Sequence, residues 1–180
     1  PTLAQISKEM EEMYGASFDC GIDKTGDNHV LKFYIETIND NFIPHNGENM
    51  LKTSIEKLVE IVFNPLIINN HFNEEYVKQE KDNIIRIIEG KTDNKAFYST
   101  ERCIEEMYKN QVYGLYKYGY IEDLEKINAT NLYEQYKDLI SNSKIDIFVS
   151  GNIDENIEKI LEENESMRML KDREGRVRYK

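Results

Sequence analysis

The run His71-Phe72-Asn73-Glu74-Glu75 is the segment of this chain that comes nearest to a catalytic motif. A His-x-x-Glu-His sequence on a helix places two imidazoles one turn apart, where they hold a zinc ion while the glutamate activates water. Here Glu75 stands in place of the second histidine, and Asn73 is expected to cap the following helix. His71 then precedes that helix, so we interpret it as a plain loop histidine.

Glu80 is the second residue whose position suggests chemistry, because its predicted helix carries an apolar face. That face is formed by Val77, Ile84, Ile87 and Ile88. Glu80 and Ile87 are seven residues apart, close to two helical turns, so they are predicted to point the same way. A carboxylate on such a face is paired, hydrogen-bonded or placed at a cleft edge, unless it is a boundary residue that reaches water.

The remaining reactive side chains indicate no other common catalytic class. Cys20 and Cys103 form no Cys-x-x-Cys pair and have no histidine nearby in the sequence, so both are expected to be reduced thiols. Three histidines are too few for a histidine-rich metal site. The chain also lacks a glycine-rich phosphate loop and a Gly-x-Ser-x-Gly elbow.

The composition is that of an acidic globular chain. Its 180 residues are 39% hydrophobic, and 34 acidic against 23 basic residues give a net charge of −11. That charge disfavours nucleic acid as a partner. No apolar run approaches the roughly 20 residues that span a bilayer, so we expect a cytoplasmic protein without a membrane partner. Residues 165–180 hold six basic and three acidic residues, which indicates a basic tail or linker after a domain at 1–164.

Helical and strand patterns cluster separately, which predicts an α+β fold with helices packed on one face of a largely antiparallel sheet. Thr2 and Gln5 form a capping-box pattern that begins the first helix. Two strands are expected to form a hairpin around the turn 24–28. Three strands make a thin sheet, so we expect a fragment that lacks N-terminal elements. Helices are predicted at about 3–14, 51–62, 74–89, 96–109 and 131–140 and from a cap at Asp154 to 163, and strands at 16–23, 29–38 and 145–151.

Six stretches of the chain carry a common pattern in their order and spacing over about residues 1–160. They are 12–19, 60–65, 72–81, 112–114 with Gly119, 121–127 and 145–154. Together they resemble the pitrilysin/insulinase family, which includes the mitochondrial processing peptidase, and they look closest to a bacterial branch of paired proteins in which one partner lacks the zinc motif. The resemblance implies a processing-peptidase-like half-domain.

The resemblance also implies where a metal site would lie. In the family, His-x-x-Glu-His precedes the segment that matches Thr2, and zinc is the cofactor. The third ligand is a glutamate seven residues after a supporting acid on the same helix. Glu80 matches the supporting acid, but the ligand position falls on Ile87, which has no donor atom. We therefore expect no metal ligand, no catalytic residue and no cofactor in this chain, and an inactive subunit.

A peptide-binding strand is the family feature that does not depend on the metal. Substrate peptides in active relatives pair with a sheet edge at the position that matches Ala16, Ser17, Phe18 and Asp19. Peptide or protein substrate is thus an implied partner, together with a homologous peptidase subunit or the remainder of the same chain. Two alternatives stay open: a fragment of an active zinc endopeptidase whose motif lies upstream of Pro1, and an interaction module unrelated to peptidases.

Overall fold

The computed structural model describes residues 2–44, 49–151 and 157–164, and it confirms the α+β class. The chain divides into two compact units, which are treated separately here. One comprises residues 1–20, 33–66 and 138–180, and the other 21–32 and 67–137. Among the described residues, no helix is both long and apolar enough to cross a membrane.

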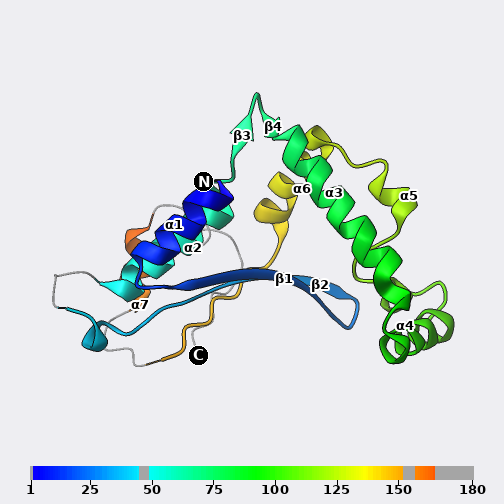
Figure 1. Ribbon diagram of the computed structural model, residues 1–180, viewed down its shortest axis with the longest axis horizontal. Coiled ribbons are helices and arrows are strands. Elements are labelled where there is room, and N and C mark those ends of the chain that lie inside the picture. Colours follow the sequence, from blue (N-terminus) through cyan, green and yellow to red (C-terminus); the bar gives the residue numbers. More distant parts are fainter. Residues whose placement is uncertain (1, 45–48, 152–156, 165–180) are drawn as a thin grey trace. The chain divides into compact units, whose positions relative to one another are not determined.

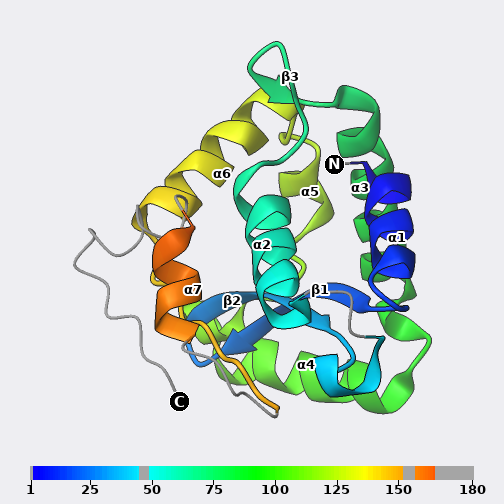
Figure 2. The same cartoon turned by 90° about the vertical axis from the view of Figure 1, so that its left-hand side faces the viewer.

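The first unit is built from helices α1 (Leu3–Glu12), α2 (Met50–Phe63) and α7 (Ile157–Glu163), and from the start and end of a β-hairpin. The predicted capping box is confirmed, since Thr2 and Gln5 each accept a hydrogen bond from the other's backbone. Figures 1 and 2 show α2 and α7 side by side, and Ile55 and Val59 of α2 pack against Ile160 and Leu161 of α7. A second cluster in this unit holds Met10, Met13, Ala16, Ile43 and Met50.

The second unit is mostly helical. Its main helices are α3 (Glu74–Glu89), α4 (Lys95–Met107), α5 (Ile121–Leu124) and most of α6 (Ala129–Asn142). Three 3₁₀ turns occur in the described chain, η1 (Asp40–Phe42), η2 (Gly90–Thr92) and η3 (Val112–Gly114). An aromatic cluster joins β4 to α6. The ring of Phe72 meets those of Tyr133 and Tyr136 edge-on, with centroids 5.4 and 5.7 Å apart.

The predicted hairpin is confirmed as strands β1 (Ser17–Thr25) and β2 (Asn28–Glu36), which pair with each other. Its turn is tighter than expected, with Gly26 and Asp27 alone between the strands. Gly26 has φ +59°, the left-handed conformation that a two-residue hairpin turn needs at its first central position. The hairpin contributes residues to both units.

A second, miniature hairpin was not predicted. Strands β3 (Ile67–Ile68) and β4 (His71–Phe72) pair antiparallel across Asn69 and Asn70, which both have positive φ. Two asparagines suit such a turn, because their short side chains tolerate the left-handed region. His71 therefore belongs to a two-residue strand rather than a plain loop, although it does precede the helix as expected.

The predicted strand at 145–151 is wrong, because the structure assigns neither helix nor strand to residues 144–150. The sequence Ile145-Asp-Ile-Phe-Val149 has strong β-propensity, but propensity reports how side chains fit a pleated surface and supplies no neighbouring strand. In the described part of the chain, the sheets are the β1–β2 and β3–β4 pairs. Asp154, the expected cap of the last helix, lies outside the described residues, and so does the tail at 165–180.

Candidate functional site

Helix α3 carries the residues that the family resemblance singled out. Asn73 caps it as predicted, accepting hydrogen bonds from the backbone of Glu75 and Tyr76 at 2.9 and 3.1 Å. Two glutamates follow in the first turn, where the helix dipole favours negative charge. Glycine at position 90 ends the α-helix as expected, and the chain continues into η2.

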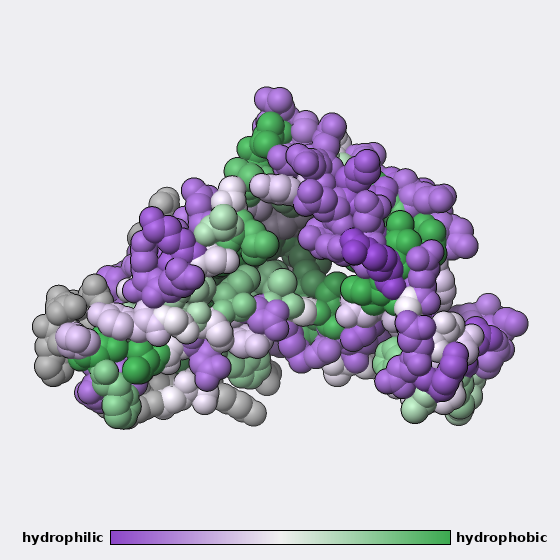
Figure 3. All heavy atoms as spheres, in the orientation of Figure 1, coloured by the Kyte–Doolittle hydropathy of each residue, from purple (hydrophilic) through white to green (hydrophobic). Residues whose placement is uncertain are grey.

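The apolar face of α3 differs from the prediction. Glu80 and Ile87 do share one side of the helix, but both are exposed, and Ile87 retains 44% of its accessible surface. Val77, Ile84 and Ile88 are covered as predicted, and Ile85 is covered in place of Ile87. The expectation that Ile87 belongs to an apolar core is therefore wrong for the described residues. Hydrophilic residues dominate the visible surface over α3 (Figure 3).

The residues at the family metal position do not fit zinc. Zinc sites in proteins need three or four nitrogen, sulfur or oxygen ligands, and Ile87 offers none. Within residues 2–44, 49–151 and 157–164, no cluster of three His, Cys, Asp or Glu side chains could hold a metal ion. Of the two acidic positions that the resemblance implies on this helix, only Glu80 carries a carboxylate. No step of any reaction can therefore be derived through a metal at α3.

Strand β1 carries the predicted peptide-binding segment, and the structure divides that segment. Ala16 is buried and precedes the strand, and its backbone N–H donates to the carbonyls of Met10 and Met13 at 3.0 and 3.3 Å. Ser17 and Asp19 are exposed within the strand, and Phe18 is half-buried against the Met10 cluster. The exposed part of the segment therefore begins at Ser17.

A further polar site lies in the second unit at what we call the α4–η3 corner, residues 102–120. An open pocket of about 540 Å³ lies here, between the end of α4 and the segment that contains η3. Charged and apolar side chains both line it. The lining includes Arg102, Glu105, Glu106, Val112, Leu115 and Tyr120.

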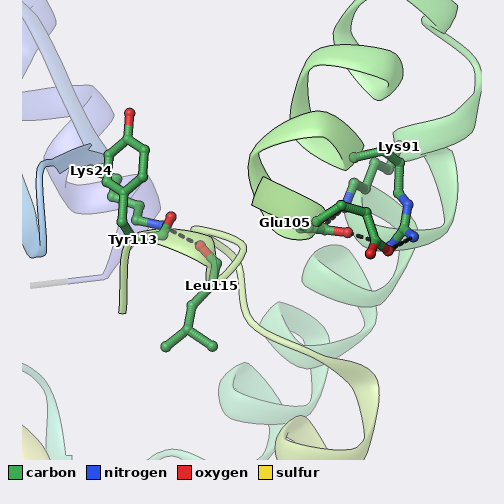
Figure 4. Close-up of polar contacts among 7 residues, drawn as sticks. Lys24, Lys91, Glu105, Tyr113 and Leu115 are labelled. Atoms are coloured by element: carbon green, nitrogen blue, oxygen red, sulfur yellow. Dashed lines mark hydrogen bonds and ion pairs between the residues drawn. The ribbon is translucent and has the colours of Figure 1, made fainter. Parts of the chain in front are cut away.

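Two lysines hold the α4–η3 corner in place (Figure 4). The Lys24 ammonium, from the end of β1, donates to the backbone carbonyls of Tyr113 and Leu115. Lys91, from η2, pairs with Glu105 and lies 4.1 Å from the centre of the Tyr116 ring. These contacts commit the Glu105 carboxylate and two backbone carbonyls of the corner to partners within the chain.

The backbone at the corner is equally tight. A β-carbon added at Gly114 would lie 2.4 Å from the carbonyl oxygen of Tyr108, a separation that real β-carbons do not show. The rings of Tyr108 and Tyr113 meet edge-on at 4.7 Å. Glycine at position 114 is therefore required by close approach of two chain segments.

The electrostatics of the corner follow from burial. Burial alone would raise the pKa of Glu105, but hydrogen bonds from Lys91 and Arg102 outweigh it and lower the pKa below its ordinary value. Burial raises the pKa of Tyr116, and nearby Glu101 adds to that rise. Glu105 thus stays ionised and Tyr116 stays protonated near neutral pH. This network was not predicted from the sequence, since Lys91 and Glu105 are 14 residues apart and no local pattern links them.

The other candidate residues are not brought together. His71 Nδ1 lies 2.6 Å from the carbonyl oxygen of Phe72, a local contact within β4. Cys20 and Cys103 are exposed thiols, as expected, and Cys103 Sγ lies 3.5 Å from the sulfur of Met107 one turn later. None of these contacts pairs a nucleophile with a base.

Comparisons with known proteins relate this chain to a bacterial relative and to a solved fold. No family model matches it. A Bacillus subtilis (strain 168) protein named "Probable inactive metalloprotease YmfF" is 34% identical over 156 residues, which cover 87% of this chain and 36% of that protein. A crystal structure of a conserved protein from Enterococcus faecalis V583 matches with a TM-score of 0.68 and 24% identity, covering 78% of this chain and 33% of that chain.

These two matches carry different weight. The chain spans about a third of the length of each protein. The structural match shows a shared fold alone, given its low identity. The sequence match shows that this chain is similar, over most of its length, to a bacterial metalloprotease homologue that is named as inactive.

Proposed function

We propose that this chain is part of a non-catalytic member of the insulinase/pitrilysin family, which binds extended peptide beside a homologous, zinc-bearing subunit. Its role is to enclose substrate and to support the active partner. The similarity to a protein named as a probable inactive metalloprotease supports the non-catalytic part of this proposal. The family and the partner rest on the sequence resemblance.

Ile87 is the single observation that carries the proposal. It stands on α3, seven residues after Glu80, where the resemblance expects the third zinc ligand. A hydrocarbon side chain cannot replace a carboxylate in a metal site. Ile87 keeps 44% of its accessible surface on a largely hydrophilic helix, so this position lies at the surface of α3 and is not filled in as core.

The β1 segment supports the peptide-binding part. Strand addition depends on backbone N–H and C=O groups, and these remain whatever happens to the side chains of a metal site. Ser17 and Asp19 are exposed in β1, and β2 covers one side of that strand. A subunit that has lost its metal ligand can therefore keep its substrate strand.

Metal content and peptide hydrolysis of the full-length protein test the proposal. Purified protein is titrated with zinc by calorimetry, and its metal is counted by mass spectrometry. Hydrolysis of quenched fluorescent peptides is then measured with the protein alone, with the homologous zinc-bearing subunit alone, and with both. We expect no stoichiometric zinc and no hydrolysis alone, and faster hydrolysis by the pair than by the active subunit alone.

Two results would overturn the proposal. Tight zinc binding at one ion per chain, with metal-dependent hydrolysis by the isolated protein, would favour an active endopeptidase. Unchanged activity of the homologous subunit over a range of concentrations of this protein would remove the supporting role.

A further inference from the structure

The pocket at the α4–η3 corner contains one basic side chain that no acid of the described chain neutralises. Its charged lining residues are Arg102, Glu105, Glu106 and Lys109. Arg102 pairs with both carboxylates, at 2.7 Å in the case of Glu105. Lys109 is exposed and forms no ion pair with any described residue. The pocket therefore presents both of its carboxylates already paired and one ammonium group unpaired.

The charge at the pocket is positive although the chain as a whole is acidic. Two further lysines bind to its lining, since Lys91 pairs with Glu105 and the Lys24 ammonium donates to the carbonyl of Leu115 (Figure 4). Four basic side chains thus accompany two carboxylates, a local balance of +2 in a chain of net charge −11. The C-terminal end of the α4 dipole, equivalent to about half a negative charge, reduces this balance without reversing it. An anion is therefore favoured at this place.

Two amides follow Lys109 in the sequence and add to its donors. Asn110 and Gln111 also line the pocket, and their exposed side chains make no hydrogen bond with any described residue. Asn110 has φ +68°, a left-handed conformation that turns the chain after the end of α4. An ammonium and amide N–H groups are the donors from which a carboxylate accepts hydrogen bonds. Three consecutive residues thus offer donors that the described chain does not use.

The pocket also has an apolar lining that remains open to water. Val112, Leu115 and Tyr120 keep 55%, 50% and 40% of their accessible surface. A ligand that covers such groups removes apolar surface from water, which favours binding. The backbone beneath them is already fixed by Lys24 and by the close approach at Gly114, so little ordering is needed when a ligand binds.

The ligand that fits these groups carries a carboxylate next to apolar side chains. The pocket is open and measures about 540 Å³, so a small acid placed in it would keep much of its surface in water. Small-molecule sites instead bury most of their ligand. The end of a longer chain suits an open pocket better, because the rest of that chain can continue into solvent. A peptide C-terminus provides both groups within one or two residues.

We infer that the α4–η3 corner binds the free C-terminus of a peptide whose last residues are apolar. The terminal carboxylate pairs with Lys109, and the apolar side chains cover Val112 and Leu115. This site recognises the charged end of a chain and does not pair with its backbone as a strand does. It is therefore independent of the peptide binding proposed above for β1.

Fluorescence anisotropy with the full-length protein and N-terminally labelled hexapeptides tests the inference. The first peptide ends in two leucines and a free carboxylate, and the second has the same sequence with a C-terminal amide. The third has a free carboxylate but ends in two serines. We expect the leucine acid to bind about fourfold more tightly than its amide, within the range of an exposed charge pair. The serine acid should also bind more weakly than the leucine acid, because it covers less apolar surface.

Substitutions at the pocket identify the groups responsible. Lys109→Met removes the charge, so it is expected to bind the leucine acid and its amide equally, and Lys109→Arg is expected to restore the preference. Val112→Ser should weaken the leucine acid and leave the serine acid unchanged. Lys95→Met is the matched control, because Lys95 is an exposed lysine at the opposite end of α4. That variant is expected to keep the fourfold preference.

Three results would overturn the inference. Equal binding of the leucine acid and its amide by the wild type, even if tight, would show that the terminal charge is not recognised. Peptide binding of that kind that also persists in Lys109→Met would still agree with strand pairing at β1, so the two proposals can fail separately. Loss of the preference in Lys95→Met as large as in Lys109→Met would show a general effect of charge. Displacement of the leucine acid by octanoate at an equal concentration would assign the pocket to a small acid.

Discussion

The α4–η3 corner and the β1–β2 hairpin both carry dense polar contacts, but they differ in how far those contacts are removed from water. The side chains of Lys91 and Glu105 at the corner keep only 12% and 14% of their accessible surface. The side chains of Lys32 and Asp23 in the hairpin keep 59% and 51%. When one partner of a buried ion pair is removed, the remaining charge is desolvated and unpaired, which lowers the free energy of unfolding. When one partner of an exposed pair is removed, water solvates the remaining charge and stability changes little.

This difference separates a region whose ion pair is withdrawn from water from one whose ion pair is exposed. Paired polar groups at the corner are committed to one another, so substitutions there should change the free energy of unfolding. The Lys32–Asp23 pair of the hairpin is open to water, so substitutions there should leave stability nearly unchanged. Four predictions test that contrast.

The largest effect is expected from Lys91→Met at the corner. The substitution leaves Arg102 as the ion-pair partner of the Glu105 carboxylate and removes the cation over the Tyr116 ring. We expect a loss of about 2 kcal/mol in the free energy of unfolding, measured by urea denaturation of the full-length protein. Adding Glu105→Gln to this variant should recover part of the loss. Equal stability of Lys91→Met and the wild type would show that the pair is not withdrawn from water.

Gly114→Ala should have the next largest effect. Its new methyl group would lie 2.4 Å from the carbonyl oxygen of Tyr108, so the backbone of the corner has to move. Overpacking of this kind destabilises by about 1 to 2 kcal/mol. Gly21→Ala in β1 is the matched control, because nothing lies within 4 Å of its added β-carbon. A change at position 21 as large as that at position 114 would contradict the contrast between the two regions.

The pH dependence of stability should show the same contrast more weakly. The pKa of Glu105 is below its ordinary value of about 4.5 in the folded chain, so its contribution is complete above that value. The contribution is lost as the pH falls through the folded pKa. Denaturation midpoints between pH 6 and pH 3 should therefore fall more steeply for the wild type than for Glu105→Gln. Parallel slopes would show that the pKa of Glu105 is the same in the folded and unfolded chain.

Local features of the sequence predicted the parts of the fold that local interactions form. The capping box of Thr2 and Gln5, the cap at Asn73 and the hairpin around Gly26 each involve residues within a few positions of one another. Helical periodicity also placed α2, α3, α4 and α6 to within a few residues at each end.

The features that were missed depend on residues far apart in the sequence. The segment Ile145–Val149 has the composition of a strand, but pairing requires a neighbour that composition does not provide. Ile87 looked like a core residue because it is apolar, whereas the covered side of α3 is determined by what packs on it. The Lys91–Glu105 pair and the contact of Lys24 with Tyr113 join segments that only the folded chain brings together.

Lys32→Met in the hairpin is expected to have the smallest effect on the free energy of unfolding, and it is the exposed counterpart of Lys91→Met at the corner. A hydrogen bond and the charge of Lys32 lower the pKa of Asp23, yet both side chains are exposed. Removing the lysine should raise the pKa of Asp23 toward its ordinary value, which carboxyl NMR titration can measure. The urea midpoint should stay unchanged, because water replaces the lost partner. A lowered urea midpoint would assign the hairpin charges to stability and abolish the division between the two regions.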